Sequence, residues 1–448
     1  MINNDLQMAL ANLVSKKRRY DLLWRYYDGE QPLVYSSEKL REIFSGLNAQ
    51  FTENWCSVVV DSVLDRLELR TPAVSDNEAV SAELADLWEA TGLVDDELAI
   101  HEDVAVTGES FVIAWLDENE QTQAFHNDAR LCHAIYDEEN PRYMRVAAKW
   151  WTDPAGPIRM TLYYPDRLEY YVTKRAFKPG EVPDARAFEP WSEEPVAANP
   201  FGQIPVFHFR SNRRRTKSQL AGVIEIQDMV NKMLADMMVA AEFGAFPQRY
   251  VISAAGIKGL ENNPNAIWDL VASDQGSQAT QAGQFAAASL DNYLNAINKL
   301  SSDIGVISRT PRHYFYAQGG DPSGEALIAM EAPLTKKVKR LQATLLPTWR
   351  DLASFLLALG GVVVSSRLVL PAYEEAATVQ PMTQALIIKA RVEAGMPHST
   401  ALKTYDGWTE ADIEEMEADA AAERMAQRSY ADAVLSAAQA DFDRGEAV

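Results

Sequence analysis

The chain has 448 residues, more than one ordinary hydrophobic core requires, so we expect two or three structural units. Hydrophobic residues make up 47% and charged residues 24%, a composition that excludes a mainly disordered chain. The 64 Asp and Glu outnumber the 42 Lys and Arg, and the formal net charge of -22 argues against a surface that holds nucleic acid tightly, while it also serves solubility.

The first hundred residues predict helices. Apolar residues at three- and four-residue spacing predict a helix over 3–27, and a second helix is expected over 54–67. Residues 77–107 are also predicted to be helical, up to Gly108. Residues 111–116 then predict a buried strand.

Residues 117–215 have a different pattern, in which Tyr, Trp, Val and Thr alternate with polar residues and Pro and Gly recur. This alternation is typical of antiparallel strands that bury one face. The expected fold class is therefore α+β, mainly α, with one β-rich part. The predicted strands cover residues 129–136, 143–151, 160–164, 168–173 and 206–210.

A helical period returns from Ser218 and again over residues 289–307. Between these two predicted helices, residues 244–285 contain one strand candidate at 249–253 and a stretch rich in Gln, Ala, Gly and Ser. The first helix is so apolar that it needs cover on more than one side.

Residues 308–324 contain two prolines and three glycines and predict a loop. A long helix should follow to about Leu359, and Pro333 and Pro347 should kink or split it. Residues 374–448 predict further helices, and 409–448 hold eleven acidic and three basic residues.

The cysteines and the apolar runs indicate a compartment. Cys56 and Cys132 form no CxxC pair, so we expect no disulfide framework and a reducing environment. The longest apolar run, residues 352–364, is shorter than the roughly 20 residues of a membrane span. We interpret it as buried core and expect no membrane partner. The polar, amphipathic start predicts no secretory signal.

The sequence lacks the usual catalytic motifs. No GxxxxGK[ST] stretch occurs, which argues against a P-loop ATPase. His101 begins like a zinc-protease motif, but Ala105 stands where the second histidine should be. His126 and His133 lack Cys or Asp partners at ligand spacing, so we predict no metal and no cofactor. A carboxylate cluster of the nuclease type stays open, because acidic residues are abundant.

The order of the predicted elements resembles that of the portal proteins of tailed bacteriophages, in particular the SPP-one type portal family. Each supporting segment is a weak signal alone, and it is their order over residues 20–360 that carries the resemblance. The segments are YYDGEQPL (26–33), NWCSVVVDSVLDRLEL (54–69), TGESFVIAW (107–115), NPFGQIPVFHFRSN (199–212) and GGDPSGEALIAMEAPLTKKV (319–338).

The resemblance implies a non-enzymatic portal fold that assembles as a ring of twelve around a central DNA tunnel. Such a ring would be the conduit for DNA packaging and ejection at the unique capsid vertex, in the virion and, during assembly, in the host cytoplasm. The implied partners are double-stranded DNA, the terminase large subunit, the head–tail connector, and the major capsid and scaffolding proteins. Residues 1–215 and 323–380 would form the wing, 216–243 and 286–307 the two stem helices, 244–285 the clip, 308–322 the tunnel loop and 381–448 the crown.

In a closed ring, neighbouring copies would cover the apolar face of the stem helices. The alternative is that the first of these helices packs inside the core of a monomer. The candidate ring-contact residues are Val223, Ile226, Val230, Met233, Met237, Leu294, Ile297 and Ile304.

Cations and aromatic side chains occur together in the predicted tunnel loop, which suits transient phosphate contact and stacking. The alternative is a surface loop whose aromatics pack under the adjacent helix. A basic turn before the first stem helix could face DNA or an acidic partner, or be a solvated turn. The DNA-facing candidates are Arg309, Arg312, His313, Tyr314, Tyr316 and Gln318, and the basic turn holds Arg213, Arg214, Arg215 and Lys217.

Two other functions remain as alternatives. The chain could be another phage head-assembly protein, such as a scaffold or a minor head protein, although the β-rich residues 117–215 argue against a coiled-coil scaffold. A metal-dependent nuclease is the second alternative, and a cleavage assay would test it.

Overall fold

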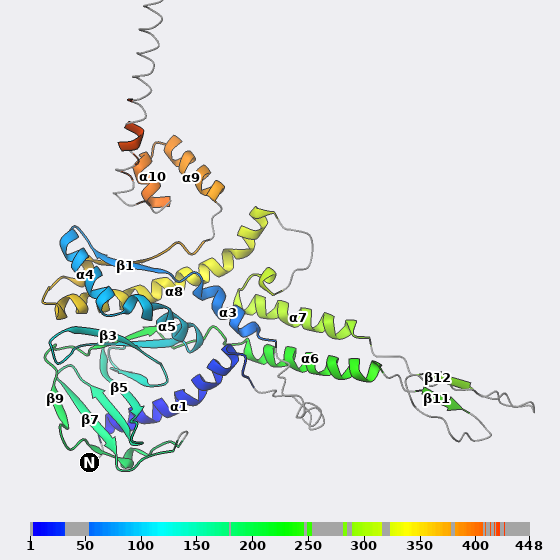
Figure 1. Ribbon diagram of the computed structural model, residues 1–448, viewed down its shortest axis with the longest axis horizontal. Helices are drawn as coiled ribbons and strands as arrows, with labels where there is room; N and C mark the ends of the chain where they lie inside the picture. The colour runs from blue at the N-terminus through cyan, green and yellow to red at the C-terminus, as the bar shows by residue number, and fades with distance from the viewer. Residues whose placement is uncertain are drawn as a thin grey trace, which may run out of the picture. The chain divides into compact units, whose positions relative to one another are not determined.

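The computed structural model describes residues 3–31, 53–178, 181–245, 249–252, 281–284, 289–315, 323–377 and 381–405, with isolated positions between 408 and 425 (Figure 1). The chain divides into two compact units, Met1–Ala377 and Thr378–Val448. All the strands that the structure describes belong to the first unit.

Four helices form the first part of this unit: α1 (Asn4–Tyr27), α3 (Trp55–Leu64), α4 (Glu78–Ala90) and α5 (Leu93–Val106). The side-chain oxygens of Asn3, Asn54 and Asn77 accept free backbone N–H groups at the starts of α1, α3 and α4, as N-caps do. The helical run predicted over 77–107 is two helices, because Gly92 adopts a left-handed backbone with φ of 72° between them.

Two antiparallel sheets form the β-rich part. The first has the strand order β10-β2-β3, and the second has the order β4-β5-β6-β7-β8 with β9 beside β7. The six strands predicted from the sequence correspond to six of these strands, whereas β3, β8 and β9 were not expected. The bounds are β2 (Glu109–Leu116), β3 (Thr122–Asn127), β4 (Cys132–Tyr136), β5 (Met144–Thr152), β6 (Ile158–Tyr163), β7 (Arg167–Thr173), β8 (Phe188–Pro190), β9 (Val196–Ala198) and β10 (Val206–Arg210), with the 3-10 helix η1 (Ala185–Ala187) before β8.

A separate two-stranded sheet joins distant parts of the chain. β1 (Leu69–Val74) pairs antiparallel with β13 (Val369–Tyr373), which the 3-10 helix η3 (Ser366–Leu368) precedes. Neither strand was predicted. The helix α4 packs against β1, so this small sheet has one covered face.

Two further helices, α6 (Ile224–Ala245) and α7 (Asp291–Ser308), correspond to the two predicted amphipathic helices. α6 begins later than expected, because residues 219–223 form turns. The short strands β11 (Arg249–Ile252) and β12 (Gln281–Gln284) pair with each other, and β12 was not expected. Most of the predicted clip, residues 253–280, lies outside the described residues.

The 3-10 helix η2 (Arg312–Tyr314) follows α7, and α8 (Gly324–Leu359) is one continuous helix although it contains Pro333 and Pro347. Of the two expected effects of the prolines, the split is therefore wrong, and the kink stays a prediction. Pro347 stands between the buried residues Leu345 and Trp349, and their packing offsets the lost backbone hydrogen bond.

Three clusters of buried side chains make up the cores of the first unit. The first surrounds Trp349, whose ring centroid lies 5.6 Å from that of Trp88 and 4.4 Å from that of Phe209. The second joins α1, α3, both larger sheets and the α6–α7 pair, and the third joins the start of α1 to the six-stranded sheet. Most of the apolar run 352–364 is core as far as Leu357, but Val363 beyond α8 is 90% exposed.

The second unit contains α9 (Pro381–Glu393) and α10 (His398–Tyr405). These helices pack on each other through Ile388, Ala401 and Leu402, with Ile413 in the same small core. The predicted helical character of this part agrees with the structure as far as Tyr405.

Candidate functional site

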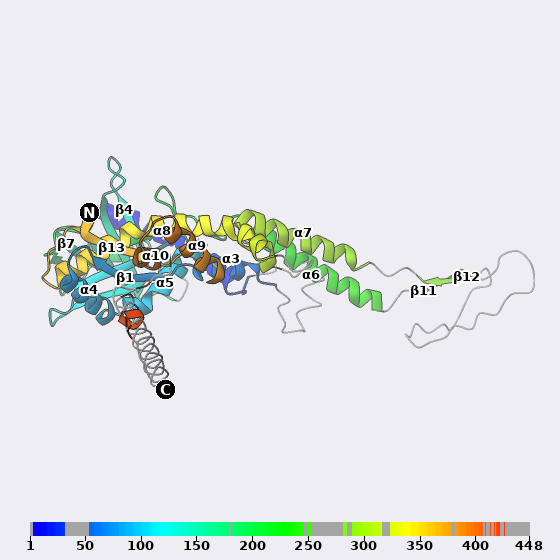
Figure 2. The same cartoon turned by 90° about the horizontal axis from the view of Figure 1, so that it is seen from above.

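The α6–α7 pair contains the predicted ring-contact residues, and the two helices lie side by side in both views (Figures 1 and 2). Val223, Val230, Ile297 and Ile304 are buried in the core that α1 and α3 share. Half of the predicted residues therefore cover the chain's own core. Ile226, Met233 and Met237 are half-buried against that core, and Leu294 is 47% exposed.

Other apolar side chains of this helix pair are exposed. Val306 is 66% exposed, Ile307 is 53% exposed and Met229 is 46% exposed. None of the three was a predicted ring contact. Ile307 continues the three- and four-residue spacing of its helix, whereas Met229 and Val306 lie beside the main apolar stripe that packs inside the chain.

The first part of the predicted tunnel loop is described as far as Phe315, whereas Tyr316 and Gln318 lie outside the described residues. η2 carries Arg312, His313 and Tyr314, and Arg309 is the C-cap of α7. The side chain of Arg312 is exposed, while that of Tyr314 is half-buried.

Tyr314 is held by an ion pair between the end of α3 and α8. Arg66 Nη2 donates to Glu331 Oε2 at 3.0 Å and to the Tyr314 hydroxyl at 2.9 Å. The hydroxyl in turn donates to Glu331 Oε1 at 3.4 Å, and His313 Nε2 lies 3.7 Å from the same oxygen. Two of the predicted DNA-facing side chains, His313 and Tyr314, thus have partners inside the chain.

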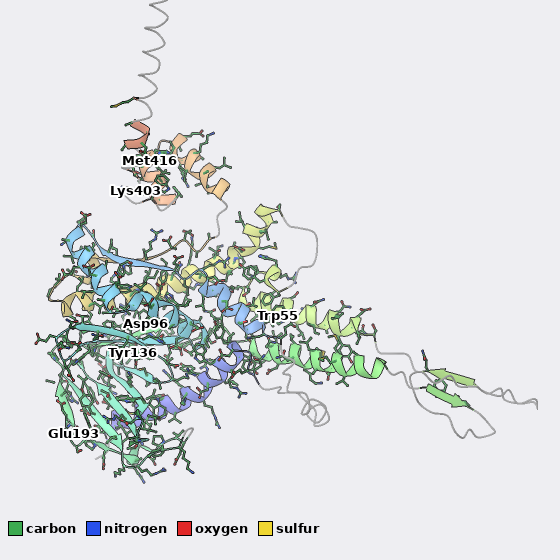
Figure 3. The ribbon with its side chains drawn as sticks, viewed as in Figure 1. Trp55, Asp96, Tyr136, Glu193, Lys403 and Met416 are labelled. Atoms are coloured by element: carbon green, nitrogen blue, oxygen red, sulfur yellow. The ribbon has the colours of Figure 1, made fainter. Side chains whose placement is uncertain are left out.

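Phe315 closes the described part of the loop as a buried side chain. Its ring centroid lies 5.2 Å from that of Trp55, the first residue of α3, in an edge-to-face arrangement. Trp55 is labelled in Figure 3. Gly305 on α7 allows this packing, because a Cβ there would lie 3.2 Å from the Phe315 ring. Tyr314 and Phe315 therefore pack as the alternative prediction of a surface loop describes.

Three positive charges lie near the end of α7. Lys337 on α8 donates its Nζ proton to the Ser308 carbonyl oxygen at 2.9 Å. Burial, followed by the charges of Arg309 and Lys217, lowers the pKa of Lys337 to about 8. Arg309 itself is exposed and has φ of 63° at the C-cap of α7. The structure thus brings the predicted loop near the predicted basic turn, and it adds Lys337, which no sequence signal marked.

The basic turn lies against the end of α5. A Cβ at Gly108, where φ is 98°, would lie 2.6 Å from the backbone nitrogen of Lys217. Ser211 Oγ accepts from this nitrogen at 3.0 Å and donates to the Lys217 carbonyl at 2.8 Å. Backbone contacts therefore shape the turn, and the side chains of Arg213, Arg214, Arg215 and Lys217 are exposed.

A buried polar network beside this turn was not predicted. Glu109 accepts from Lys16 and, at 2.8 Å, from the Tyr20 hydroxyl, and His208 Nε2 lies 2.9 Å from its Oε2. Burial raises the pKa of the Glu109 carboxyl, but the contacts with His208 and Lys16 outweigh this effect and hold it below its usual range. Burial lowers the pKa of His208, so we assign a neutral ring whose Nδ1 accepts from the hydroxyl of Tyr136 at 3.0 Å.

This network joins α1 to β2 and β10 of one sheet and to β4 of the other. Its role is to connect these elements, because each of its members is satisfied inside the fold. The available sequence signal was an acidic residue at the start of an apolar strand.

Within the described residues, no group of three or more His, Cys, Asp and Glu side chains is arranged to hold a metal ion. His126 Nε2 instead lies 2.9 Å from Asp103 Oδ2. In the same part of the chain, no helix combines the length and apolar character needed to cross a membrane.

A family model described as phage portal protein, SPP1 Gp6-like, matches residues 10–425. The chain belongs to this family. The match confirms the resemblance drawn from the order of the sequence motifs. Portal proteins of Mycobacterium phages D29 and L5 are each 25% identical to the chain, over 316 and 322 residues. The matched part covers 65% of this chain and 62% of each relative, so the chain spans less than two thirds of their length.

Two solved structures of gene transfer agent particles contain chains similar to this portal-family chain. A chain of the virion of the native particle is 11% identical, with a TM-score of 0.45, and the match covers 84% of this chain and 95% of that one. A chain of the neck of the empty particle is also 11% identical, with a TM-score of 0.45, covering 88% and 94%.

Proposed function

We propose that this chain is the subunit of a portal ring, a non-enzymatic assembly of twelve copies at the unique vertex of a tailed-phage capsid. Double-stranded DNA enters and leaves through the ring. The ring docks the terminase large subunit during packaging and the head–tail connector afterwards, and it assembles with the major capsid and scaffolding proteins, in the host cytoplasm before the virion is complete. The observation that carries the proposal is the family match over residues 10–425.

The proposed division follows from the family. In it, residues 1–215 and 323–380 form the wing, 216–243 and 286–307 the stem, 244–285 the clip, 308–322 the tunnel loop and 381–448 the crown. The side-by-side packing of α6 and α7 supports the stem, and the division of the chain after Ala377 supports a separate crown.

Exposed apolar residues of the α6–α7 pair support ring formation. Leu294, Val306 and Ile307 are each about half exposed or more, which is costly for a monomer in water. In a closed ring each copy makes the same heterologous contact with its neighbour, so these side chains are covered in every subunit.

The proposed DNA contacts come mainly from cations of the loop. Arg309 and Arg312 are exposed, whereas His313 and Tyr314 have partners within the chain. Tyr316 and Gln318 stay candidates on their place in the sequence.

The acidity of the chain suits a conduit. A protein whose net charge is -22 offers few Lys and Arg side chains to DNA phosphates. Counterions therefore stay on the DNA, and the DNA slides without breaking many protein–phosphate contacts. Substituting Lys for several acidic residues of 409–448 should slow packaging or release. Unchanged DNA packaging and release in such variants would contradict this idea.

The mass of the purified protein in solution, with negative-stain images of the same sample, tests the proposal. We expect a species near twelve subunits that appears as rings with a central hole. A stable monomer calls for co-expression with capsid and scaffolding proteins, because subunits can await a scaffold. A folded monomer that never assembles with them would overturn the proposal, and a nuclease assay would follow.

A further inference from the structure

Three cations near the end of α7 come from separate segments of this acidic chain and have no carboxylate partner among the described residues. In the described part of the chain, no carboxylate oxygen lies within 4.0 Å of the side-chain nitrogens of Lys217, Arg309 or Lys337. By contrast, Arg70 and Arg167 pair with carboxylates at 2.6 Å and 2.8 Å. The cluster is therefore not neutralised by the described residues around it.

The fold holds these charges together from separate segments. The backbone of Lys217 is packed against Gly108, and the start of α6 is close to the end of α7, where a Cβ on Gly222 would lie 3.5 Å from Ile307 Cγ2. On the other side, Lys337 reaches across from α8 to the Ser308 carbonyl at 2.9 Å.

Lys337 is half-buried, whereas Lys217 and Arg309 are exposed, so an anion beside the three would relieve the repulsion that Lys337 meets. Burial lowers the pKa of Lys337 most, and the charges of Arg309 and Lys217 lower it further. The Ser308 carbonyl and the C-terminal end of α7 supply partial negative charge, which is less than one full countercharge.

We propose that Lys217, Arg309 and Lys337 form a binding site for a phosphate group of double-stranded DNA in the ring. The site rests on the proposed function, and it adds Lys217 and Lys337 to the contacts expected of the tunnel loop. The neighbouring exposed cations Arg213–Arg215 and Arg312 extend the positive surface. A row of unpaired cations suits a polyanion better than a single carboxylate of an adjacent copy.

The test uses the full chain and a short labelled DNA duplex, with binding measured by anisotropy over a series of KCl concentrations. Lys217→Gln removes one exposed cation and should lower the slope of log K against log salt by about 0.9, the value of one phosphate contact. Lys337→Gln should act in the same way. Arg186→Gln is the matched control, because Arg186 is an exposed cation of η1 outside the cluster and should leave the slope unchanged.

The outcomes separate the possible roles. An unchanged slope in folded Lys217→Gln would overturn the phosphate site, and this exposed position keeps the test valid if Lys337→Gln fails to fold. An unchanged slope with loss of rings would overturn it in favour of a carboxylate from the adjacent copy. A lower Tm with an unchanged slope would overturn it in favour of helix capping at α7. Failure of the unaltered chain to form rings, alone or with capsid proteins, would count against the proposed function, and the slopes would still decide the DNA site.

Discussion

The Nε2 atom of His208 lies 2.9 Å from the Oε2 atom of Glu109, and both side chains are buried. Lys16 supplies the positive charge at the same carboxylate, so Glu109 stays ionised while His208 stays neutral. A buried carboxylate of this kind depends on every one of its partners, since any lost partner leaves charge without compensation.

Glu109→Gln should therefore lower the free energy of unfolding at pH 7 by roughly 3 kcal/mol. Urea unfolding followed by tryptophan fluorescence measures this change. Glu193→Gln is the control, because Glu193 is exposed, and it should change little. Equal unfolding free energies for Glu109→Gln and the unaltered chain would contradict the importance of the network.

The same network predicts a dependence on acid. Because the pKa of Glu109 is lowered in the folded state, its stabilisation is present above the unfolded value of about 4.3 and is lost as the pH falls below it. The pKa of the His208 ring is also lowered in the folded state. Below about pH 6.5 the ring is therefore protonated more readily in the unfolded chain, and the folded state loses stability. The free energy of unfolding should thus decline in two steps, and Glu109→Gln should lack the lower one.

Gly108→Ala should lower the free energy of unfolding by more than about 2 kcal/mol, since it combines a positive φ with a backbone clash. Its Cβ would lie 2.6 Å from the Lys217 nitrogen. Gly202→Ala is the matched control, because Gly202 also has a positive φ, of 65°, and no atom lies within 4 Å of its Cβ position. That change should cost about 1 kcal/mol. Similar costs at the two positions would show that the close approach does not matter.

Arg66→Met should lower the free energy of unfolding by about 2 kcal/mol, because the Arg66–Glu331 pair is mostly buried. It should also speed cleavage by trypsin after Arg312, since Tyr314 loses its donor. Arg70→Met removes an exposed pair with Glu374, and it should cost less than about 1 kcal/mol. Cleavage at Arg312 that is no faster in Arg66→Met than in Arg70→Met would contradict a role of Arg66 in holding η2.

Leu294→Asp and Val306→Asp should reduce the ring fraction in solution, while the thermal unfolding midpoint of the subunit changes little. A charge placed in an apolar contact between copies is desolvated without a partner, whereas it stays hydrated in the monomer. Val363→Asp, at a 90% exposed apolar residue outside the helix pair, is the control. If rings form equally well in all three variants, the exposed face of the α6–α7 pair is not the contact between copies.

Local patterns were sufficient to predict the elements with strong periodicity. The spacing of Leu6, Leu10 and Leu13 predicted α1, and these residues are buried as that spacing requires. The apolar face of α6 was also predicted. Which side chains pack against that face could not be predicted, because periodicity does not distinguish contacts within the chain from contacts with another copy. Val223 and Val230 turned out to cover the chain's own core.

Contacts between distant residues could not be predicted from local patterns. Leu69 pairs with Tyr373, and no feature of either short segment marks the other. In the same way, Lys337 is an ordinary helical lysine in the sequence, and its meeting with Ser308 depends on how α7 and α8 pack. In α8 a local signal was misleading: Pro347 predicts a break, but the packing of its buried neighbours keeps the helix continuous.

The pairing of β1 with β13 also has a consequence for synthesis. The ribosome makes the chain from the N-terminus, so β1 emerges early. Its partner β13 is the last strand of the first unit and is made much later. In the interval the backbone edge of β1 is available to other nascent chains, which is a known route to aggregation. Truncation before Val369 should therefore yield insoluble protein, although nearly all of the helices and strands of the first unit have been made by then.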